Sequence, residues 1–194
     1  MYIPKSINDP LGNYSFDDLE EEIKIEKGSC GTFQVNEKTE NTYEFSVRQI
    51  YGKLSNRKKA PLFALIDWRG NLRYDLRFWK DNDNPSKGIT FTKEELLELH
   101  NALAAFSFEA IYNNPIRQYK IGDSIVTFYH LIAKLSTSSN KNGTWQKEVN
   151  LIDWGCGTRV DFRKWTSDYQ RHSRGIRIGL DELMSLKSII ETIF

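Results

Sequence analysis

The chain has 194 residues, of which 39% are apolar and 27% charged, and this composition is enough for one large or two small domains with a buried core. It has no run of about 18 apolar residues that could span a bilayer, and its N-terminus lacks the pattern of a signal peptide. We therefore expect a protein of the cytoplasm that does not enter a membrane. The two cysteines, Cys30 and Cys156, are too few for a disulfide framework and form no CxxC motif.

The net charge of +1 is distributed unevenly along the chain. Residues 1–30 contain three lysines and seven acidic residues, whereas residues 31–194 contain 24 basic and 19 acidic residues. The acidic segment could keep the protein soluble, recruit a partner or compete for a basic groove. We favour solubility or an ordinary amphipathic strand as its interpretation. The basic remainder is compatible with a nucleic-acid partner but does not require one.

The chain contains an internal repeat. The segment LIDWRGNLRYDLRFW at residues 65–79 returns without a gap as LIDWGCGTRVDFRKW at residues 151–165. Upstream, GKLS returns as AKLS, and downstream KGITFTKEELLEL returns as RGIRIGLDELMSL. Three matched blocks in the same order indicate two copies of one unit. We predict an acidic extension over 1–30, a first repeat over 31–106, and a linker with the second repeat over 107–194.

In the first copy, runs rich in β-branched and aromatic residues predict four strands followed by one helix. The strands are expected at residues 43–55, 60–68, 71–79 and 88–92. The helix begins at Thr92 with Glu95 three positions later, which is a capping box. Its apolar stripe consists of Leu96, Leu99 and Leu103.

The second copy follows the same course. Asn142 and Gly143 predict a hairpin between its first two strands, because both residues tolerate positive φ. Its final helix carries Leu183, Leu186 and Ile190 at helical spacing. Each repeat is therefore predicted to be a four-stranded sheet that buries one face under its own C-terminal helix, which gives an α+β fold. The two apolar helices could also pack on each other.

The third strand of each copy separates its side chains into two faces, because alternate residues of a strand point in opposite directions. One face carries Arg73, Asp75, Arg77 and Trp79 in the first copy, and Arg159, Asp161, Arg163 and Trp165 in the second. Arginine binds phosphate through paired hydrogen bonds, and an exposed indole can stack on any base, so this combination suits single-stranded nucleic acid. The alternative is a solvated face on which each aspartate pairs with a neighbouring arginine. Trp68 and Trp154, next to this face, are equally compatible with packing and with base stacking.

These blocks resemble the family of the transcriptional coactivator positive cofactor four, in particular its short bacterial YdbC-like branch. The likeness is carried by KLSTSSNKNGTWQKEVNLIDW, VDFRKW and RGI in the second copy and by KLS, LIDW, YDLRFW and KGI in the first. The resemblance implies an antiparallel sheet and helix that dimerises through the helix and binds single-stranded DNA with little sequence preference. Because one chain carries two copies, we expect an intramolecular pseudo-dimer that is a monomer in solution, with higher assembly left open.

The resemblance also implies a set of binding residues. The family's arginine corresponds to Arg77 and Arg163, and its tryptophan to Trp79 and Trp165. With the neighbouring basic and aromatic residues, the candidate nucleic-acid-binding set is Lys53, Trp68, Arg73, Arg77, Trp79, Lys87, Lys134, Trp145, Lys147, Trp154, Arg159, Arg163, Trp165 and Arg174. The first copy has no counterpart of Trp145, so it is expected to bind more weakly.

Other functional classes have less support in the sequence. The histidines His100, His130 and His172 lack metal-ligand spacing, and no catalytic constellation is present, so we expect neither an enzyme nor a metal, a cofactor or a small-molecule substrate. A protein interaction scaffold that uses the same Trp and Arg face is the main alternative, because interfaces favour both residue types. The sequence does not distinguish between DNA and RNA as the bound strand.

Overall fold

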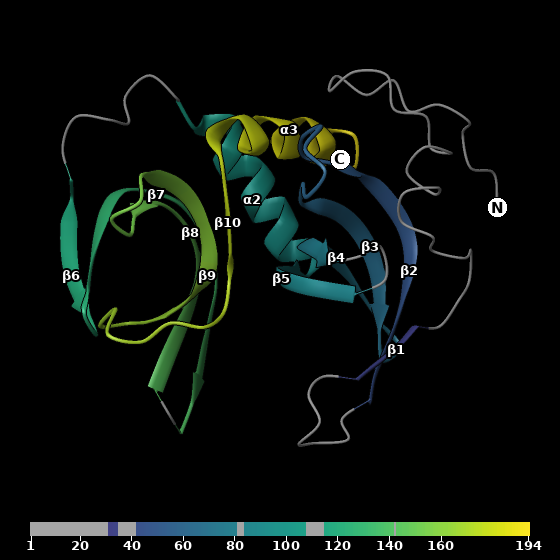
Figure 1. Cartoon of the computed structure of the whole chain (residues 1–194), viewed down its shortest axis with the longest axis horizontal. Coiled ribbons are helices and arrows are strands. Elements are labelled where there is room, and N and C mark those ends of the chain that lie inside the picture. Colours follow the sequence, from purple (N-terminus) through teal and green to yellow (C-terminus); the bar gives the residue numbers. More distant parts are fainter. Residues whose placement is uncertain (1–30, 35–41, 81–83, 108–114, 142) are drawn as a thin grey trace. The chain divides into compact units, whose positions relative to one another are not determined.

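The computed structural model describes residues 31–34, 42–80, 84–107, 115–141 and 143–194. The chain divides into two compact units, Met1–Thr92 and Lys93–Phe194. In the described residues, each unit contains one antiparallel sheet of five strands, and the two helices belong to the second unit (Figure 1). The α+β class that the sequence predicts is therefore correct.

The first sheet has the strand order β1-β2-β3-β4-β5, so each strand pairs with its neighbours in the sequence. Its strands are β1 (Gly31–Gln34), β2 (Thr42–Lys53), β3 (Leu62–Trp68), β4 (Asn71–Lys80) and β5 (Asn84–Phe91). The core side of this sheet buries Phe63, Leu76 and Phe91 completely. Antiparallel neighbours can be joined by short connections, as β3 and β4 are by two residues.

The second sheet has the order β10-β9-β8-β7-β6. Its strands are β6 (Arg117–Ile121), β7 (Ser124–Asn140), β8 (Gly143–Asp153), β9 (Thr158–Thr166) and β10 (Ile176–Ile178). The helices of this unit are α2 (Lys93–Ala105) and α3 (Leu180–Glu191). The predicted hairpin joins β7 to β8 through the pairing of Asn140 with Gly143, whose φ is 113°. Asn142 itself lies outside the described residues.

The predicted strands and helices are present, but each sheet has one more strand than expected. The additional strands, β1 and β6, are four and five residues long and both lie at a sheet edge. Short edge strands have a weak hydrophobic pattern because they bury little surface. The prediction of four-stranded sheets is therefore wrong in strand number and correct in connectivity.

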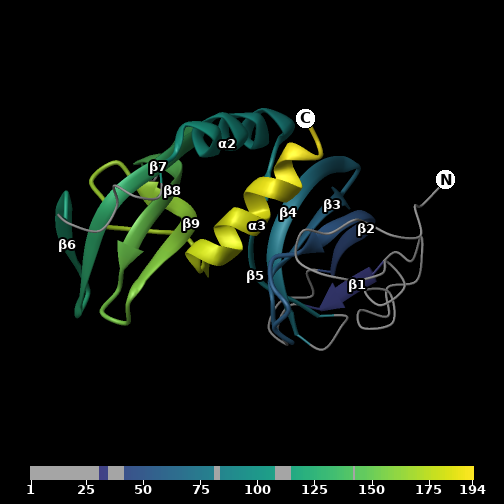
Figure 2. The same ribbon diagram turned by 90° about the horizontal axis from the view of Figure 1, so that it is seen from above.

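The helix α2 packs against β7 and α3 of the second unit (Figure 2). Its apolar stripe is buried, as predicted. The side chain of Glu95 accepts a hydrogen bond from Ser136 Oγ at 2.6 Å and forms an ion pair with Lys147 Nζ at 2.5 Å. The second compact unit thus begins at the start of α2, whereas the first sequence repeat ends after that helix.

The two sheets repeat the same strand register. Arg77 pairs with Leu62 across β4 and β3, and Arg163 pairs with Glu148 across β9 and β8. One step further, Asp75 faces Ala64 and Asp161 faces Asn150 in the same way. Leu62 and Ala64 therefore occupy the positions in the first sheet that Glu148 and Asn150 occupy in the second.

The glycine of each basic-residue-and-glycine pair allows a close approach to the third strand. A Cβ on Gly175 would overlap the carbonyl oxygen of Phe162 and lie 2.6 Å from Cβ of Arg163. A Cβ on Gly88 would likewise overlap Cβ of Arg77 and lie 2.7 Å from the carbonyl oxygen of Leu76. Both glycines therefore serve the packing of the sheet.

Replacing Gly175 with alanine is expected to lower the free energy of unfolding by about 1–3 kcal/mol, because the new methyl group meets backbone atoms that have no room to move. Gly88→Ala should have a comparable effect in the first unit. Urea unfolding followed by circular dichroism measures both changes. An unchanged midpoint for the two variants would show that the strands separate easily at these points.

No helix in the described part of the chain is long and apolar enough to cross a membrane.

Candidate nucleic-acid interface

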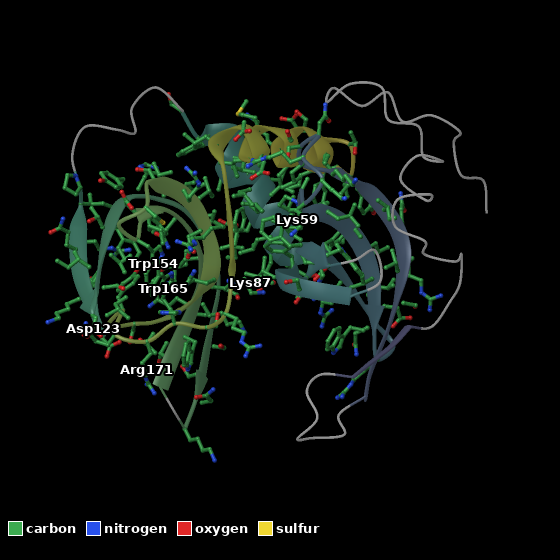
Figure 3. The ribbon with its side chains drawn as sticks, viewed as in Figure 1. Lys59, Lys87, Asp123, Trp154, Trp165 and Arg171 are labelled. Carbon is green, nitrogen blue, oxygen red and sulfur yellow. The ribbon has the colours of Figure 1, made fainter. Side chains whose placement is uncertain are left out.

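The candidate interface is the face of each sheet that carries the third-strand arginines and tryptophans, and we call it the arginine-tryptophan face. In the second sheet, cross-strand pairing places Glu148 and Asn150 on this face, opposite Arg163 and Asp161. Figure 3 shows Trp154 and Trp165 within the curve of this sheet. The opposite face of β9 buries Val160 and Phe162, as the alternation of the sequence predicts.

Both third-strand arginines hold an aspartate two residues earlier on the same strand. Arg163 donates from Nε and Nη2 to the two carboxylate oxygens of Asp161, each at 2.6 Å, and Arg77 makes the same paired contact with Asp75. Both aspartates are buried, and burial raises the pKa of Asp161 although Arg163 favours its ionised form. Arg163 is itself only 8% exposed. The aspartate-arginine pairing that the sequence leaves open as an alternative is therefore present on this strand, and the guanidinium of Arg163 is engaged by it.

Trp165 is fully buried, so it cannot serve as an exposed platform for bases in this conformation. Its indole ring lies in a cluster with Val126, Phe128, Ile152 and Tyr169. Trp154 stacks on it with a centroid distance of 6.0 Å and an interplanar angle of 19°. Trp165 is buried because the segment after β9 folds back, so that Tyr169 and His172 both contact its ring.

The corresponding tryptophans of the first sheet are half-buried. Trp79 packs against Ile50 and Leu62, and Trp68 packs against Ala64 and Ile66. Both indoles thus rest on an aliphatic surface and retain some exposed area. The first repeat therefore has the more accessible third-strand tryptophan. The lack of a Trp145 counterpart, from which we expect weaker binding by this repeat, does not predict this difference.

Apart from Arg77 and Arg163, the predicted basic residues fall into three groups. The first group is exposed to solvent and consists of Lys87, Lys134, Arg159 and Arg174. The second group, Lys53 and Arg73, is half-buried, and burial lowers the pKa of Lys53. Lys147 forms the third group: it lies on the other face of β8, buried against Glu95 of α2, so its assignment to the interface is wrong.

Two exposed arginines of the second unit lie near half-buried indoles. The guanidinium carbon of Arg177 is 6.0 Å from the ring centroid of Trp154, and that of Arg171 is 5.7 Å from the ring centroid of Trp145. Both distances lie within the range of a cation-π contact. The sequence shows these arginines only as additional charge near the predicted strands, because their partners are far away along the chain.

The positive charge of the chain is concentrated in the sheets. Residues 42–92 contain ten basic and five acidic residues, and residues 115–179 contain eleven basic and five acidic residues. The helices α2 and α3 each contain one basic and three acidic residues. In the second sheet, the acidic residues Glu148 and Asp161 and the basic residues Lys147 and Arg163 are all buried, so the excess of six positive charges belongs to the other residues of this range.

No group of histidine, cysteine and acidic residues in the described ranges could hold a metal ion. No protein-family model matches the chain, and a search of curated proteins finds no match.

Proposed function

We propose that the protein binds single-stranded nucleic acid, single-stranded DNA in the first place, along the basic sheets and not along the helices. The observation that carries this proposal is the separation of charge, with an excess of five and six positive charges over the two sheets and an excess of two negative charges on each helix. Phosphate groups are attracted to such a surface at any sequence. The acidic helices would repel the same backbone.

The chemistry divides between the two kinds of side chain on the second sheet. Lys134, Arg159 and Arg177 are exposed and can neutralise phosphates from the surface. Trp154 is half-buried, with Arg177 near its ring, and offers part of an indole for stacking. Stacking on an aromatic ring is tolerant of base identity. The buried pair of Arg163 and Asp161 then serves to position Trp154, whose ring centroid is 4.9 Å from the guanidinium carbon of Arg163.

The proposal includes the assembly and cellular location that the family resemblance implies. Two repeats with the same strand register suit an intramolecular pseudo-dimer acting inside the cell as a cofactor of transcription or DNA maintenance. Static light scattering at several protein concentrations should then give the mass of one chain, 22.7 kDa. A concentration-independent mass of two chains would instead mean that repeats pair between molecules.

The test is a titration of labelled single-stranded DNA, single-stranded RNA and duplex DNA at two salt concentrations. The logarithm of the binding constant should fall with the logarithm of salt concentration by about 0.7 for each phosphate contact on a single strand. The ranking of the three ligands identifies the preferred nucleic acid. Absence of salt-dependent binding to all three would exclude the proposed function and favour a protein interaction scaffold.

A matched pair of lysine variants separates the sheet from the helix. Lys134→Ala should reduce the salt slope by about 0.7, because Lys134 lies exposed on β7 and would lose one phosphate contact. Lys93→Ala removes an equally exposed charge at the start of α2 and should leave the slope unchanged. Fluorescence anisotropy at several salt concentrations measures both. Equal effects of the two variants would mean that binding is diffuse and has no defined face.

A further inference from the structure

The arginine-tryptophan face of the second sheet contains a cluster of buried polar atoms without protein partners. In the described part of the chain, these atoms are Arg117 Nε, Trp154 Nε1, Trp165 Nε1 and Asn150 Oδ1. Buried polar atoms normally find a hydrogen-bond partner, because leaving one unpaired costs about 1–3 kcal/mol. Three unpaired donors and one unpaired acceptor on one face point to a polar ligand that reaches them.

The centre of this face is occupied by the ring of Tyr169, which comes from the segment between β9 and β10. The ring stacks on Tyr119 with a centroid distance of 5.1 Å and an interplanar angle of 19°. The guanidinium carbon of Arg117 lies 4.0 Å from the centroid of the same ring, and Phe128 meets it edge-on. We call the residues around this ring, Arg117, Tyr119, Phe128, Glu148 and Trp165, the Tyr169 cradle. Stacking on an aromatic ring and contact with an arginine are the ways in which proteins hold an unpaired base.

The backbone at Tyr169 is strained. Its φ is 58°, in a region that favours glycine and that an aromatic residue adopts at a cost. The hydroxyl group of Tyr169 donates to the carboxylate of Glu148, with its oxygen 3.0 and 3.1 Å from the two carboxylate oxygens. Burial and the nearby Glu148 carboxylate raise the pKa of Tyr169 to about 12, so the phenol keeps its proton. The Tyr169 ring therefore fills the cradle although the backbone conformation of this residue costs free energy.

The first sheet shows that the fold does not need these polar groups. Leu62 and Ala64 stand there at the positions of Glu148 and Asn150, in the same register opposite an Arg and an Asp. A buried carboxylate and a buried amide cost free energy that an aliphatic pair does not. In the second sheet these two groups bond to each other and to the Tyr169 hydroxyl. They therefore hold Tyr169 in place, and the same carboxylate is available to a ligand that takes the place of its ring.

We propose that the Tyr169 cradle binds one unpaired guanine base in the place that the Tyr169 ring occupies; this site rests on the proposed function. A carboxylate only accepts hydrogen bonds, and Glu148 accepts from the Tyr169 hydroxyl and, at Oε2, from Asn150 Nδ2. Guanine presents two adjacent donors, N1–H and the N2 amino group, on one edge. Adenine, cytosine and thymine each place an acceptor next to their donor on that edge, and this acceptor would face the carboxylate.

The first experiment compares two strands on the whole protein: oligothymidine with one central guanine, and the same strand with adenine at that position. Recognition of a base through two hydrogen bonds to one side chain favours that base over the others by roughly 5- to 150-fold in affinity. Tyr169→Phe removes the hydrogen bonds that the Tyr169 hydroxyl makes with Glu148 and with Arg117, so this variant should bind the guanine strand several-fold more tightly than the unmodified protein does. Near-ultraviolet circular dichroism shows whether this variant keeps its aromatic packing.

The second experiment replaces the polar pair with the residues of the first sheet. Because Glu148→Leu with Asn150→Ala copies a pair that already packs in this register, the double variant is expected to fold. It should bind the adenine strand as the unmodified protein does and lose the preference for guanine. Asp123→Asn removes an exposed carboxylate in the turn between β6 and β7 and should keep that preference (Figure 3).

The outcomes separate this site from the proposed function. Salt-dependent binding of both strands with equal affinity, in the unmodified protein and in Tyr169→Phe, would overturn the guanine site and leave the proposed function standing. Persistence of the preference in the double variant of Glu148 and Asn150 would also overturn it. If no strand binds but guanosine monophosphate, and not adenosine monophosphate, quenches tryptophan fluorescence of Tyr169→Phe, then the base site stands and strand binding fails.

Discussion

Arg163→Ala is expected to lower the free energy of unfolding by about 3–5 kcal/mol, because it leaves the buried carboxylate of Asp161 without its partner. The variant also loses the guanidinium that lies 4.9 Å from the ring centroid of Trp154. Arg159→Ala is the matched control: it lies four residues earlier on the same strand and face, is exposed, and should change stability by less than about 0.5 kcal/mol. Chemical unfolding of both variants at neutral pH gives the comparison.

The pH dependence of the Arg163→Ala variant follows from Asp161. Burial raises the pKa of Asp161 in the folded protein above its value in the unfolded chain. A group with a raised pKa favours the folded state below the unfolded pKa, about 4 for aspartate, and this contribution is lost as the pH rises. Removing Arg163 raises the pKa of Asp161 further. The difference in the free energy of unfolding between the variant and the unmodified protein should therefore be largest at neutral pH and smaller near pH 4. A deficit independent of pH would show that Asp161 stays neutral with or without Arg163.

Trp165→Ala is expected to destabilise the second unit by about 3–5 kcal/mol, since the side chain is fully buried and its removal leaves a large cavity. Trp79→Ala in the first unit should cost less, because the equivalent indole is half-buried. Thermal unfolding with two probes measures both effects. A loss of nucleic-acid affinity in Trp165→Ala without a loss of stability would mean that this indole stacks on bases and that the observed packing opens readily.

The sequence was a good guide to the strands and to their faces. Period two along β9 correctly placed Asp161, Arg163 and Trp165 together, and the repeat correctly predicted that the first sheet would do the same. The burial of Trp165 could not be predicted, because its ring is covered by Tyr169 and His172, which lie in a segment without a counterpart in the repeated blocks. Alternation tells which residues share a face, but it does not tell what lies over that face.

The position of Lys147 shows a second limit of sequence reasoning. Its basic side chain lies within a block that resembles a binding strand, but it pairs with Glu95, which is 52 residues away along the chain. The separation hides the pair from any local pattern. Arg171 and Arg177 escaped assignment for the same reason, because only folding brings them near the indoles of Trp145 and Trp154.

The packing of α2 against β7 determines how this protein can be divided for study. A fragment that starts where the second repeat starts in the sequence would lack α2, and Lys147 would lose its buried partner Glu95. A fragment cut before Lys93 keeps that helix with the strands it contacts. Dissection at the duplication boundary would therefore damage the half it was meant to isolate, whereas a cut one helix earlier should yield a piece that folds by itself.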